Sequence, residues 1–281
     1  MSIKIITDNC CDLPAEVLNQ YDIRVVPLRV RFGDEEIPLS GFDNQAFYQK
    51  MKASLVLPST NQPLPGDFME EYRTSTANQQ EVISIHFSSA LSGTVQAANI
   101  AAKMIEKDRV IVFDSLKASV GQGLLVLEAA RMASAGADSE DILKRLTEMQ
   151  HTMRCVFVVG NLDALLKGGR LTKTKALIAN TLDIKPVLHI DDFGRIEPFK
   201  KAKGHKGARN KLLEIMSREA KDLPEQTVGI CHSNCPEDAE YLRQTIMEQF
   251  GVREVVVGEI GPVIGSHVGA GTFAVFYEAM K

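Results

Sequence analysis

The chain has 281 residues, of which 44% are hydrophobic and 24% are charged, and its formal net charge is −4. This length exceeds the usual size of a single hydrophobic core, so we expect two domains. The negative net charge argues against the basic surface with which nucleic-acid-binding proteins neutralise phosphates, and we expect no nucleic acid as a partner.

The first half of the chain begins with short extended segments. Residues 3–7 predict a strand, and Asp12 precedes Pro14 as the expected cap of a helix. Residues 23–32 form a β-branched extended segment, in which Pro27 indicates a sheet edge or a bulge.

Apolar strands then alternate with helices. We expect strands at 81–87, 109–113 and 155–160, and helices at 92–107, 120–136 and 138–150. Strands separated by helices of this length predict parallel βαβ units, with both faces of the sheet covered. Ligands of such sheets bind beyond the carboxyl ends of the strands.

The second half has a different pattern. Residues 184–203 predict a β-hairpin. Helices near 206–220 and 237–249, strands at 227–232 and 253–261, and a glycine-rich loop feeding a short final helix follow. The paired glycines of LLKGGR favour a boundary near 160–169. We therefore predict an α/β protein with an N-terminal domain of residues 1–160 and a C-terminal domain of residues 161–281.

The segment SSALSGT, residues 88–94, follows a strand and precedes a helix. One interpretation is an N-cap, because a hydroxyl satisfies free N–H groups of the first helical turn. The other is a cradle for an anion, which the helix N-terminus favours. The position after a strand favours the cradle, and the two roles are compatible for Ser92.

Common catalytic motifs are absent from the sequence. It contains neither the G-x-S-x-G of a nucleophile elbow nor a P-loop. GAGTFA, residues 269–274, resembles a dinucleotide loop, but too little chain follows it for the next strand and its acidic residue. We expect no cofactor.

Small polar groups occur instead in three separate loops. PSTNQP contains Ser59 and Thr60, SSALSGT contains Ser92, and GSHVGAG contains His267 among glycines that permit close backbone approach. Arg170 in KGGR is a candidate fixed cation. A histidine in such a loop is more often structural than functional, so His267 has two open interpretations.

The compartment is predicted from the N-terminus and the cysteines. MSIKIITD lacks the regions of a secretory signal, and no apolar run approaches the ~18 residues of a membrane span. We expect a cytoplasmic protein with five reduced thiols. Cys231 and Cys235 are interpreted as a strand end and a turn, because two further metal ligands have no evident candidates.

Seven ordered motifs, spread from Thr7 to Gly271, resemble those of the DegV family of bacterial fatty-acid-binding proteins: TDNCCDLP, PSTNQP, SSALSGT, FDS, LLKGGR, IKPVL with GRI, and GPVIGSHVGAG. The resemblance implies a Rossmann-like parallel sheet flanked by helices, a C-terminal α/β sandwich, and a long-chain fatty acid in a tunnel between them. It also implies a non-catalytic, lipid-carrying subunit of a fatty acid kinase. A separate ATP-dependent kinase subunit would convert the presented carboxylate to an acyl phosphate.

The resemblance implies that Thr60, Ser92 and His267 bind the carboxylate, with Arg170 near the same end. Supporting positions follow from the same motifs: Ser59, Gly93, Gly265 and Ser266. The chain departs from the family pattern at Asn61 and at Asn9-Cys10-Cys11, and both departures affect the expected shape of the site or its access.

Two alternatives differ in class from this carrier. Ser92 with His267 as base would make a hydrolase or acyltransferase, which also needs an orienting carboxylate and an oxyanion pocket. A carrier of another lipid anion would need no kinase. Basic residues at 200–209 are either a solvated surface or a docking patch for a partner. Lipid exchange would involve transient contact with a membrane surface.

Overall fold

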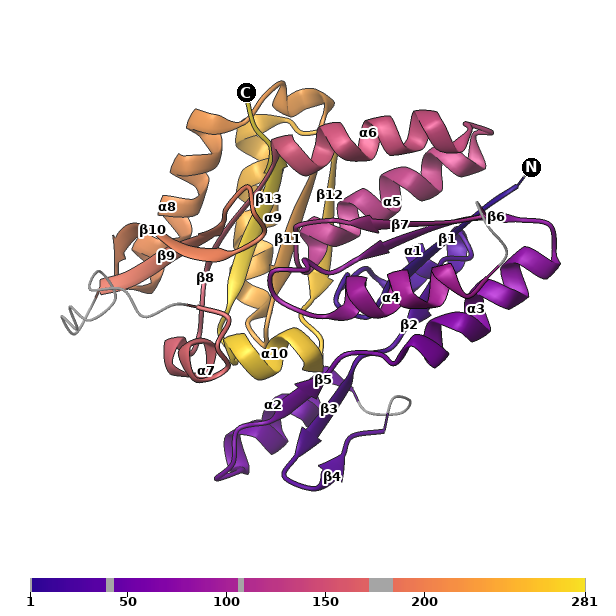
Figure 1. Ribbon diagram of the computed structural model, residues 1–281. Coiled ribbons are helices and arrows are strands. Elements are labelled where there is room, and N and C mark those ends of the chain that lie inside the picture. Colours follow the sequence, from indigo (N-terminus) through magenta and orange to yellow (C-terminus); the bar gives the residue numbers. More distant parts are fainter. Residues whose placement is uncertain (1, 39–42, 106–108, 172–183, 281) are drawn as a thin grey trace.

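The computed structural model describes residues 2–38, 43–105, 109–171 and 184–280. Helix α5 (Val120–Ser134) packs against both of the two main sheets, and a small third sheet projects below them (Figure 1). Over the described residues, no helix is both long enough and apolar enough to cross a membrane.

The first sheet is parallel, as the βαβ pattern predicts, with strand order β2-β1-β6-β7. Its strands are β1 (Ile3–Asp8), β2 (Arg24–Val26), β6 (Glu81–His86) and β7 (Val110–Asp114). Ile6 and Val82 face α3 (Pro65–Ala77) and α4 (Thr94–Lys103), whereas Ile5 and Ile83 face α5 (Val120–Ser134). Because both faces are covered, most side chains of β1 and β6 are buried.

The second sheet has six strands in the order β10-β9-β8-β13-β11-β12. They are β8 (Met153–Val158), β9 (Ile184–Ile190), β10 (Ile196–Lys203), β11 (Thr227–His232), β12 (Glu254–Glu259) and β13 (Phe273–Glu278). β11 and β12 are parallel, and the other pairs are antiparallel. Helices α8 (Gly204–Glu219) and α9 (Pro236–Phe250) cover one face, and α5 with α6 (Ser139–Thr152) cover the other.

Two predictions for this sheet were wrong. β8 is not the next parallel strand of the first sheet, since it pairs antiparallel with β13 and β9. The C-terminal segment is not a loop feeding a final helix: helix α10 (Pro262–Val268) comes first and strand β13 follows. β13 is buried on both faces, and a central strand position suits its aromatic and β-branched residues. The domain boundary at 160 stays a prediction, and β8 lies on its N-terminal side.

The third sheet, of order β4-β3-β5, contains β3 (Arg29–Phe32), β4 (Glu35–Glu36) and β5 (Ser59–Asn61). Pro27 lies between the edge strand β2 and β3, so the predicted segment 23–32 is two strands in two sheets. Helix α2 (Asn44–Ala53) packs Phe47 and Tyr48 against α10. Shorter elements are α1 (Ala15–Gln20), α7 (Leu162–Lys167) and a 3₁₀ turn (Leu223–Glu225).

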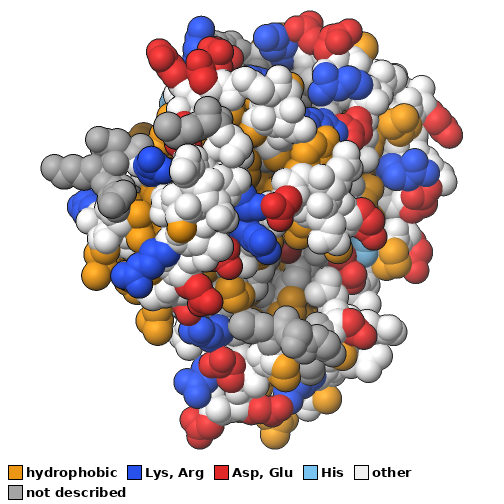
Figure 2. Space-filling model, turned by 90° about the vertical axis from the view of Figure 1, so that its right-hand side faces the viewer, with side chains coloured by type: hydrophobic (Ala, Val, Ile, Leu, Met, Phe, Trp, Pro, Cys, Tyr) orange, Lys and Arg blue, Asp and Glu red, His pale blue; other side chains and the backbone are white. Residues whose placement is uncertain are grey.

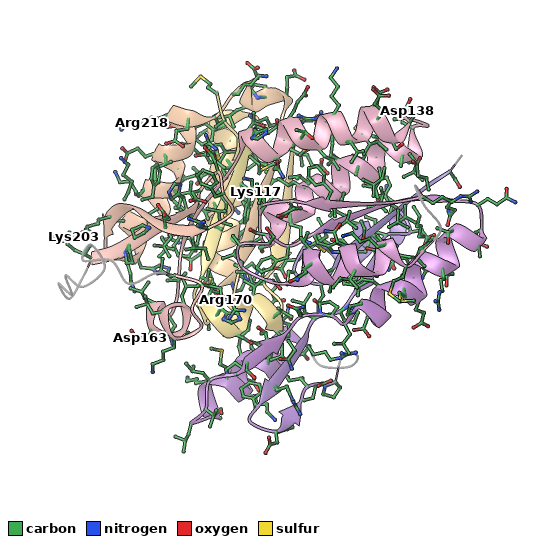
Figure 3. All side chains as sticks on the ribbon, in the orientation of Figure 1. Lys117, Asp138, Asp163, Arg170, Lys203 and Arg218 are labelled. Atoms are coloured by element: carbon green, nitrogen blue, oxygen red, sulfur yellow. The ribbon has the colours of Figure 1, made fainter. Side chains whose placement is uncertain are left out.

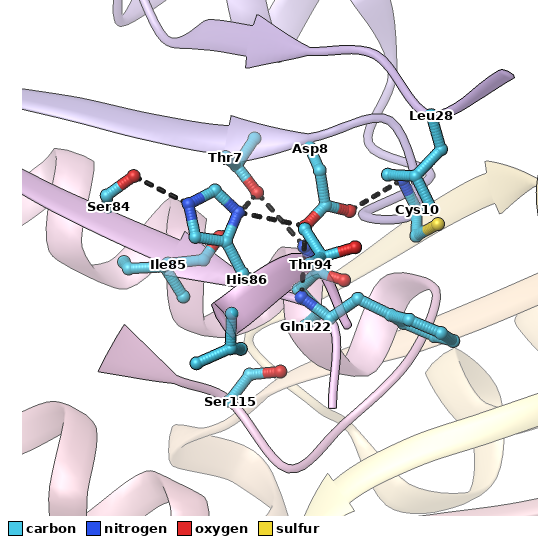
Figure 4. A network of polar contacts seen from close by, with 12 residues as sticks. Thr7, Asp8, Cys10, Leu28, Ser84, Ile85, His86, Thr94, Ser115 and Gln122 are labelled. Atoms are coloured by element: carbon cyan, nitrogen blue, oxygen red, sulfur yellow. Dashed lines mark hydrogen bonds and ion pairs between the residues drawn. The ribbon is translucent and has the colours of Figure 1, made fainter. Parts of the chain in front are cut away.

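A buried polar network joins β1 to β6 (Figure 4). His86 Nδ1 lies 2.9 Å from Asp8 Oδ2, and His86 Nε2 lies 2.6 Å from Ser84 Oγ. The Tyr72 hydroxyl donates to Ser84 Oγ at 2.8 Å. Asp8, Ser84, His86 and Tyr72 are fully buried. Each polar group is therefore satisfied within the protein, as burial requires.

Asp12 does not cap a helix as predicted. Its backbone has φ 47°, and α1 begins three residues later. The buried carboxyl instead accepts hydrogen bonds from Ser119 Oγ at 2.5 Å and from the Gly261 N–H at 3.0 Å. Asp12 thus links three distant segments rather than its own helix.

Candidate functional site

A cavity of about 700 Å³, including the space where it opens to solvent, lies between the second sheet, α10 and the loops that follow β2, β6 and β7 of the first sheet. Most of its lining is apolar and comes from both halves of the chain: Leu28, Phe87, Leu91, Ala118, Phe157, Leu165, Ile190, Ile196, Ile260, Val263, Ile264, Val268, Ala274 and Phe276. Further lining residues carry hydroxyl, thiol, imidazole or guanidinium groups: Thr60, Ser92, Ser119, Cys155, Arg170, Cys231, His267 and Thr272.

Two predicted binding residues meet at one end of this cavity. Thr60 Oγ1, on β5, lies 2.9 Å from His267 Nε2, in the last turn of α10. The two residues are 207 positions apart in the chain. Gly168 permits this placement, since a Cβ there would lie 2.5 Å from His267 Nδ1. His267 therefore lies on a helix, and not in the predicted glycine-rich loop.

Ser92 lines the same cavity and also satisfies the start of α4. Its Oγ accepts a hydrogen bond from the N–H of Thr94 at 3.3 Å and lies 2.8 Å from Thr94 Oγ1. The N-cap residue of α4 is Gly93, so the helix begins two residues later than predicted. The hydroxyl of Ser92 thus has both a local partner and a place in the cavity wall.

Arg170 adds a positive charge beside α10 (Figure 3). Its Nε donates to the Leu91 carbonyl at 3.2 Å and its Nη1 to the Gly168 carbonyl at 2.6 Å. Burial lowers the pKa of the guanidinium from its usual value. In the part of the chain that the structure describes, no carboxylate forms an ion pair with Arg170. A half-buried cation that none of the described carboxylates neutralises favours an anionic ligand.

The imidazole of His267 is neutral at physiological pH. Burial, followed by the charge of Arg170, lowers its pKa from 6.5 to about 4. Its hydrogen-bond partner is the hydroxyl of Thr60, and no described Asp or Glu bonds the ring. A Ser–His hydrolase would need the serine on the imidazole and a carboxylate behind it. Ser92 instead contacts Thr94, so the geometry disfavours the hydrolase alternative.

The polar end of the cavity continues into a hollow on the surface. This hollow encloses about 960 Å³ including open solvent, and it shares Leu28, Thr60, Ser92 and Arg170 with the cavity. Its other lining residues are Arg29, Glu36, Asn61, Gln62, Leu64 and Gly93. A group held at Thr60 and Ser92 is therefore accessible from outside the protein.

Ser59 and Ser266, two of the predicted supporting residues, do not face the cavity. Ser59 is exposed on β5, where it alternates with Thr60. Ser266 is buried, and its Oγ donates to the carbonyl of Pro262 one helical turn earlier. The strand and helix periodicities turn both hydroxyls away from the polar end.

The predicted glycines contribute by close packing. A Cβ at Gly93 would lie 1.9 Å from Gln62 Oε1, and a Cβ at Gly265 would lie 2.6 Å from the Tyr48 hydroxyl oxygen. Tyr48 also donates to the carbonyl of Ile260 at 2.8 Å. Gly265 therefore permits the close contact of α10 with α2 that brings the third sheet to the cavity.

Three further lining residues of the second sheet, Cys155, Phe157 and Cys231, were not identified as site residues from the sequence. Cys155 pairs with Phe276, and Phe157 and Cys231 both pair with Ala274, across three neighbouring strands of the second sheet. Alternation along each strand turns these side chains to one face. The alternation is readable from the sequence, but the strand order that brings the rows together is not.

The described ranges contain no cluster of three or more His, Cys, Asp or Glu side chains that could hold a metal ion. All five cysteines are buried free thiols.

Basic and acidic side chains are interspersed over the face shown in Figure 2. Of the basic segment 200–209, Lys200, Lys201 and Lys203 are exposed, while Arg209 is paired with Asp238.

Comparisons with known proteins agree with the resemblance. A family model described as "Uncharacterised protein, DegV family" matches residues 2–280. A DegV domain-containing protein of Clostridium perfringens is 36% identical over 97% of this chain and 96% of its own length.

Two solved structures cover 100% of this chain and 100% of their own. One is a DegV family protein from Thermus thermophilus described as binding fatty acid, at a TM-score of 0.93 and 32% identity. The other is DegV of Bacillus subtilis, described as a fatty acid binding protein, at a TM-score of 0.88 and 33% identity. The predicted two-sheet α/β fold is confirmed by these likenesses.

Proposed function

This chain belongs to the DegV family, and we propose that it binds a long-chain fatty acid in the cavity beside its second sheet. The carboxylate is held by Thr60, Ser92 and His267, with Arg170 as the nearby positive charge. The protein carries the acid and presents it to a separate kinase subunit, without chemistry of its own.

The observation that carries this proposal is a mostly apolar cavity whose wall also contains Thr60, Ser92, Arg170 and His267, three of which it shares with the surface hollow. A carboxylate removed from water needs charge-assisted hydrogen bonds, for which two hydroxyls and an imidazole N–H are suitable donors. At ~0.8 kcal/mol per buried CH₂, a chain of about sixteen carbons gives roughly 12 kcal/mol of gross burial energy. Ordering and association offset much of this gain.

The proposed place of the carboxylate is beside Thr60 and His267. Thr60 Oγ1 lies 2.9 Å from His267 Nε2. A carboxylate between them accepts one hydrogen bond from the hydroxyl of Thr60 and one from an N–H of the neutral imidazole. The charge of Arg170 stabilises the carboxylate, and the acyl chain extends along the second sheet toward Phe276.

The surface hollow supports the presenting role, because it reaches the same hydroxyls as the cavity. A carboxylate oxygen attacks the γ-phosphorus of ATP held by the kinase subunit, which forms an acyl phosphate and releases ADP. The exposed Lys200, Lys201 and Lys203 are the docking residues in this proposal. Transient contact with a membrane surface serves exchange of the lipid.

Mass spectrometry of the purified protein, first native and then denatured, tests the ligand. We expect a co-purified fatty acid, or uptake of added palmitate by an empty protein. A protein that contains no lipid and ignores added fatty acids contradicts the proposal.

Two further assays separate the carrier from its alternatives. The protein alone should release no product from an acyl ester, and turnover abolished by Ser92→Ala would establish the hydrolase instead. Phosphorylation of the bound acid by an added ATP-dependent kinase partner tests the presenting role. Binding without phosphorylation by any such partner would leave a carrier unconnected to a kinase.

A further inference from the structure

The carboxyl of Asp12 joins three segments around the cavity. It accepts a hydrogen bond from the hydroxyl of Ser119, which is the N-cap residue of α5 and part of the cavity wall. It also accepts a hydrogen bond from the N–H of Gly261, the N-cap residue of α10. The acceptor lies in the loop after β1, so a single side chain connects the first sheet to both helices.

Two residues of this contact have unusual backbone conformations, and a third segment packs closely against them. Asp12 and Ser119 both have positive φ, 47° and 53°, which non-glycine residues rarely adopt. A Cβ at Gly258 of β12 would lie 2.1 Å from the carbonyl oxygen of Asp12. Such conformations persist where the contacts around them are strongly determined, and they occur often at functional positions.

α10 transmits this contact to the polar end of the cavity. The helix has seven residues, and His267 lies in its last turn, about 9 Å along the axis from Gly261. Because the helix has only about two turns, we expect a shift of its N-cap residue, Gly261, to displace its last turn. The distance between His267 and Thr60 therefore depends on how Gly261 is held.

We propose that Asp12 is a positioning residue for the fatty-acid site, which fixes Ser119 in the cavity wall and sets the place of His267 through the start of α10. This inference rests on the function proposed above. Asp12 does not contact the ligand, and it acts through two hydrogen bonds that its ionised carboxylate accepts.

The contact gives ligand binding a pH dependence. Burial raises the pKa of Asp12 to about 7, against the lowering effect of the bonds from Ser119 and Gly261. The other titratable or charged groups that face Asp12 are Asp8, Glu259, Cys10, Cys11, Cys231 and Tyr48. None of these six is basic, so none of them neutralises the carboxylate. Protonation removes the charge at the start of α10 and weakens both bonds.

The test measures palmitate affinity of the full chain between pH 6 and 8, below the concentration at which the acid forms micelles. We expect the affinity of the wild type to fall about fivefold or more as the pH decreases. Asp12→Asn should show no such step. Ser119→Ala removes a bond that lowers the pKa of Asp12, so its step should move to higher pH.

Asp238→Asn is the matched control, because Asp238 is also buried but bonds His205 and Arg209 of α8. It should keep the wild-type profile. An Asp12→Asn or Ser119→Ala protein with the wild-type step overturns the inference, and Ser119→Ala decides alone if Asp12→Asn does not fold. A wild type that binds no palmitate at any pH overturns the proposed function instead.

Discussion

His86 and His267 each bond a hydroxyl, but they differ in what stands on the other side of the ring. His86 has the carboxylate of Asp8 at 2.9 Å and the hydroxyl of Ser84 at 2.6 Å, and all three residues are fully buried. His267 has the hydroxyl of Thr60 at 2.9 Å and the cation of Arg170 nearby, and it lines a cavity.

The difference separates a structural site from the proposed binding site. The network of His86 is complete, because every ring nitrogen has a partner within the protein. The site of His267 lacks the carboxylate that Asp8 supplies to His86. A bound fatty acid would supply that group.

Asp8→Ala should destabilise the protein by about 3–5 kcal/mol, since a buried histidine loses its carboxylate. The N–H groups of Cys10 and Phe87 lose the same acceptor. Urea unfolding monitored by circular dichroism measures the effect. His267→Ala, compared in the same assay, should change stability far less. A loss below about 1 kcal/mol for Asp8→Ala would mean that the network is not structural.

His267→Ala, Thr60→Ala and Ser92→Ala should each weaken fatty acid binding by about 1–3 kcal/mol, because a polar partner of the carboxylate is removed. Titration calorimetry of the folded variants measures this loss. Ser59→Ala is the matched control, since Ser59 neighbours Thr60 on β5 but is exposed. Unchanged affinity in all three variants would place the carboxylate elsewhere.

Ligand binding should raise the pKa of His267 from about 4, by about one unit or more, because a carboxylate favours the charged imidazole. In the free protein the neutral ring stabilises the fold above pH 6.5, and this contribution is lost as the pH falls toward 4. Nuclear magnetic resonance of the labelled histidines follows both states. An identical titration with and without palmitate would argue against contact with the carboxylate.

Ser266→Ala should leave affinity unchanged and should cost about 1 kcal/mol of stability, because the lost hydroxyl is buried and donates one hydrogen bond. Its hydroxyl donates to the Pro262 carbonyl within α10 and points away from the cavity. The same calorimetry and unfolding assays apply. A loss of affinity comparable with that of His267→Ala would show that the residue before the histidine also reaches the ligand.

Much of the fold was predictable because its signals are local. Turn residues and apolar runs predicted the hairpin of β9 and β10, helices α5, α6, α8 and α9, and the parallel first sheet. The predictions failed where tertiary pairing decided the outcome. β8 lies within a βα series along the chain, yet its partner β13 comes more than a hundred residues later.

The candidate site follows the same division. Hydroxyls beside a helix start and a histidine among glycines are local features, and they identified Ser92, Thr60 and His267 as candidates. The partner of each was not predictable. Ser266 has the same local setting as His267, and only the helical rotation of α10 distinguishes them.

Signals between residues close together in the chain were enough to predict the parallel first sheet, the β9–β10 hairpin, the small polar loops and the family resemblance. They did not predict that Thr60 meets His267 across 207 positions, or that Asp12 bonds Gly261 across 249. Such contacts form when distant segments pack around a shared core. No local propensity encodes their distance.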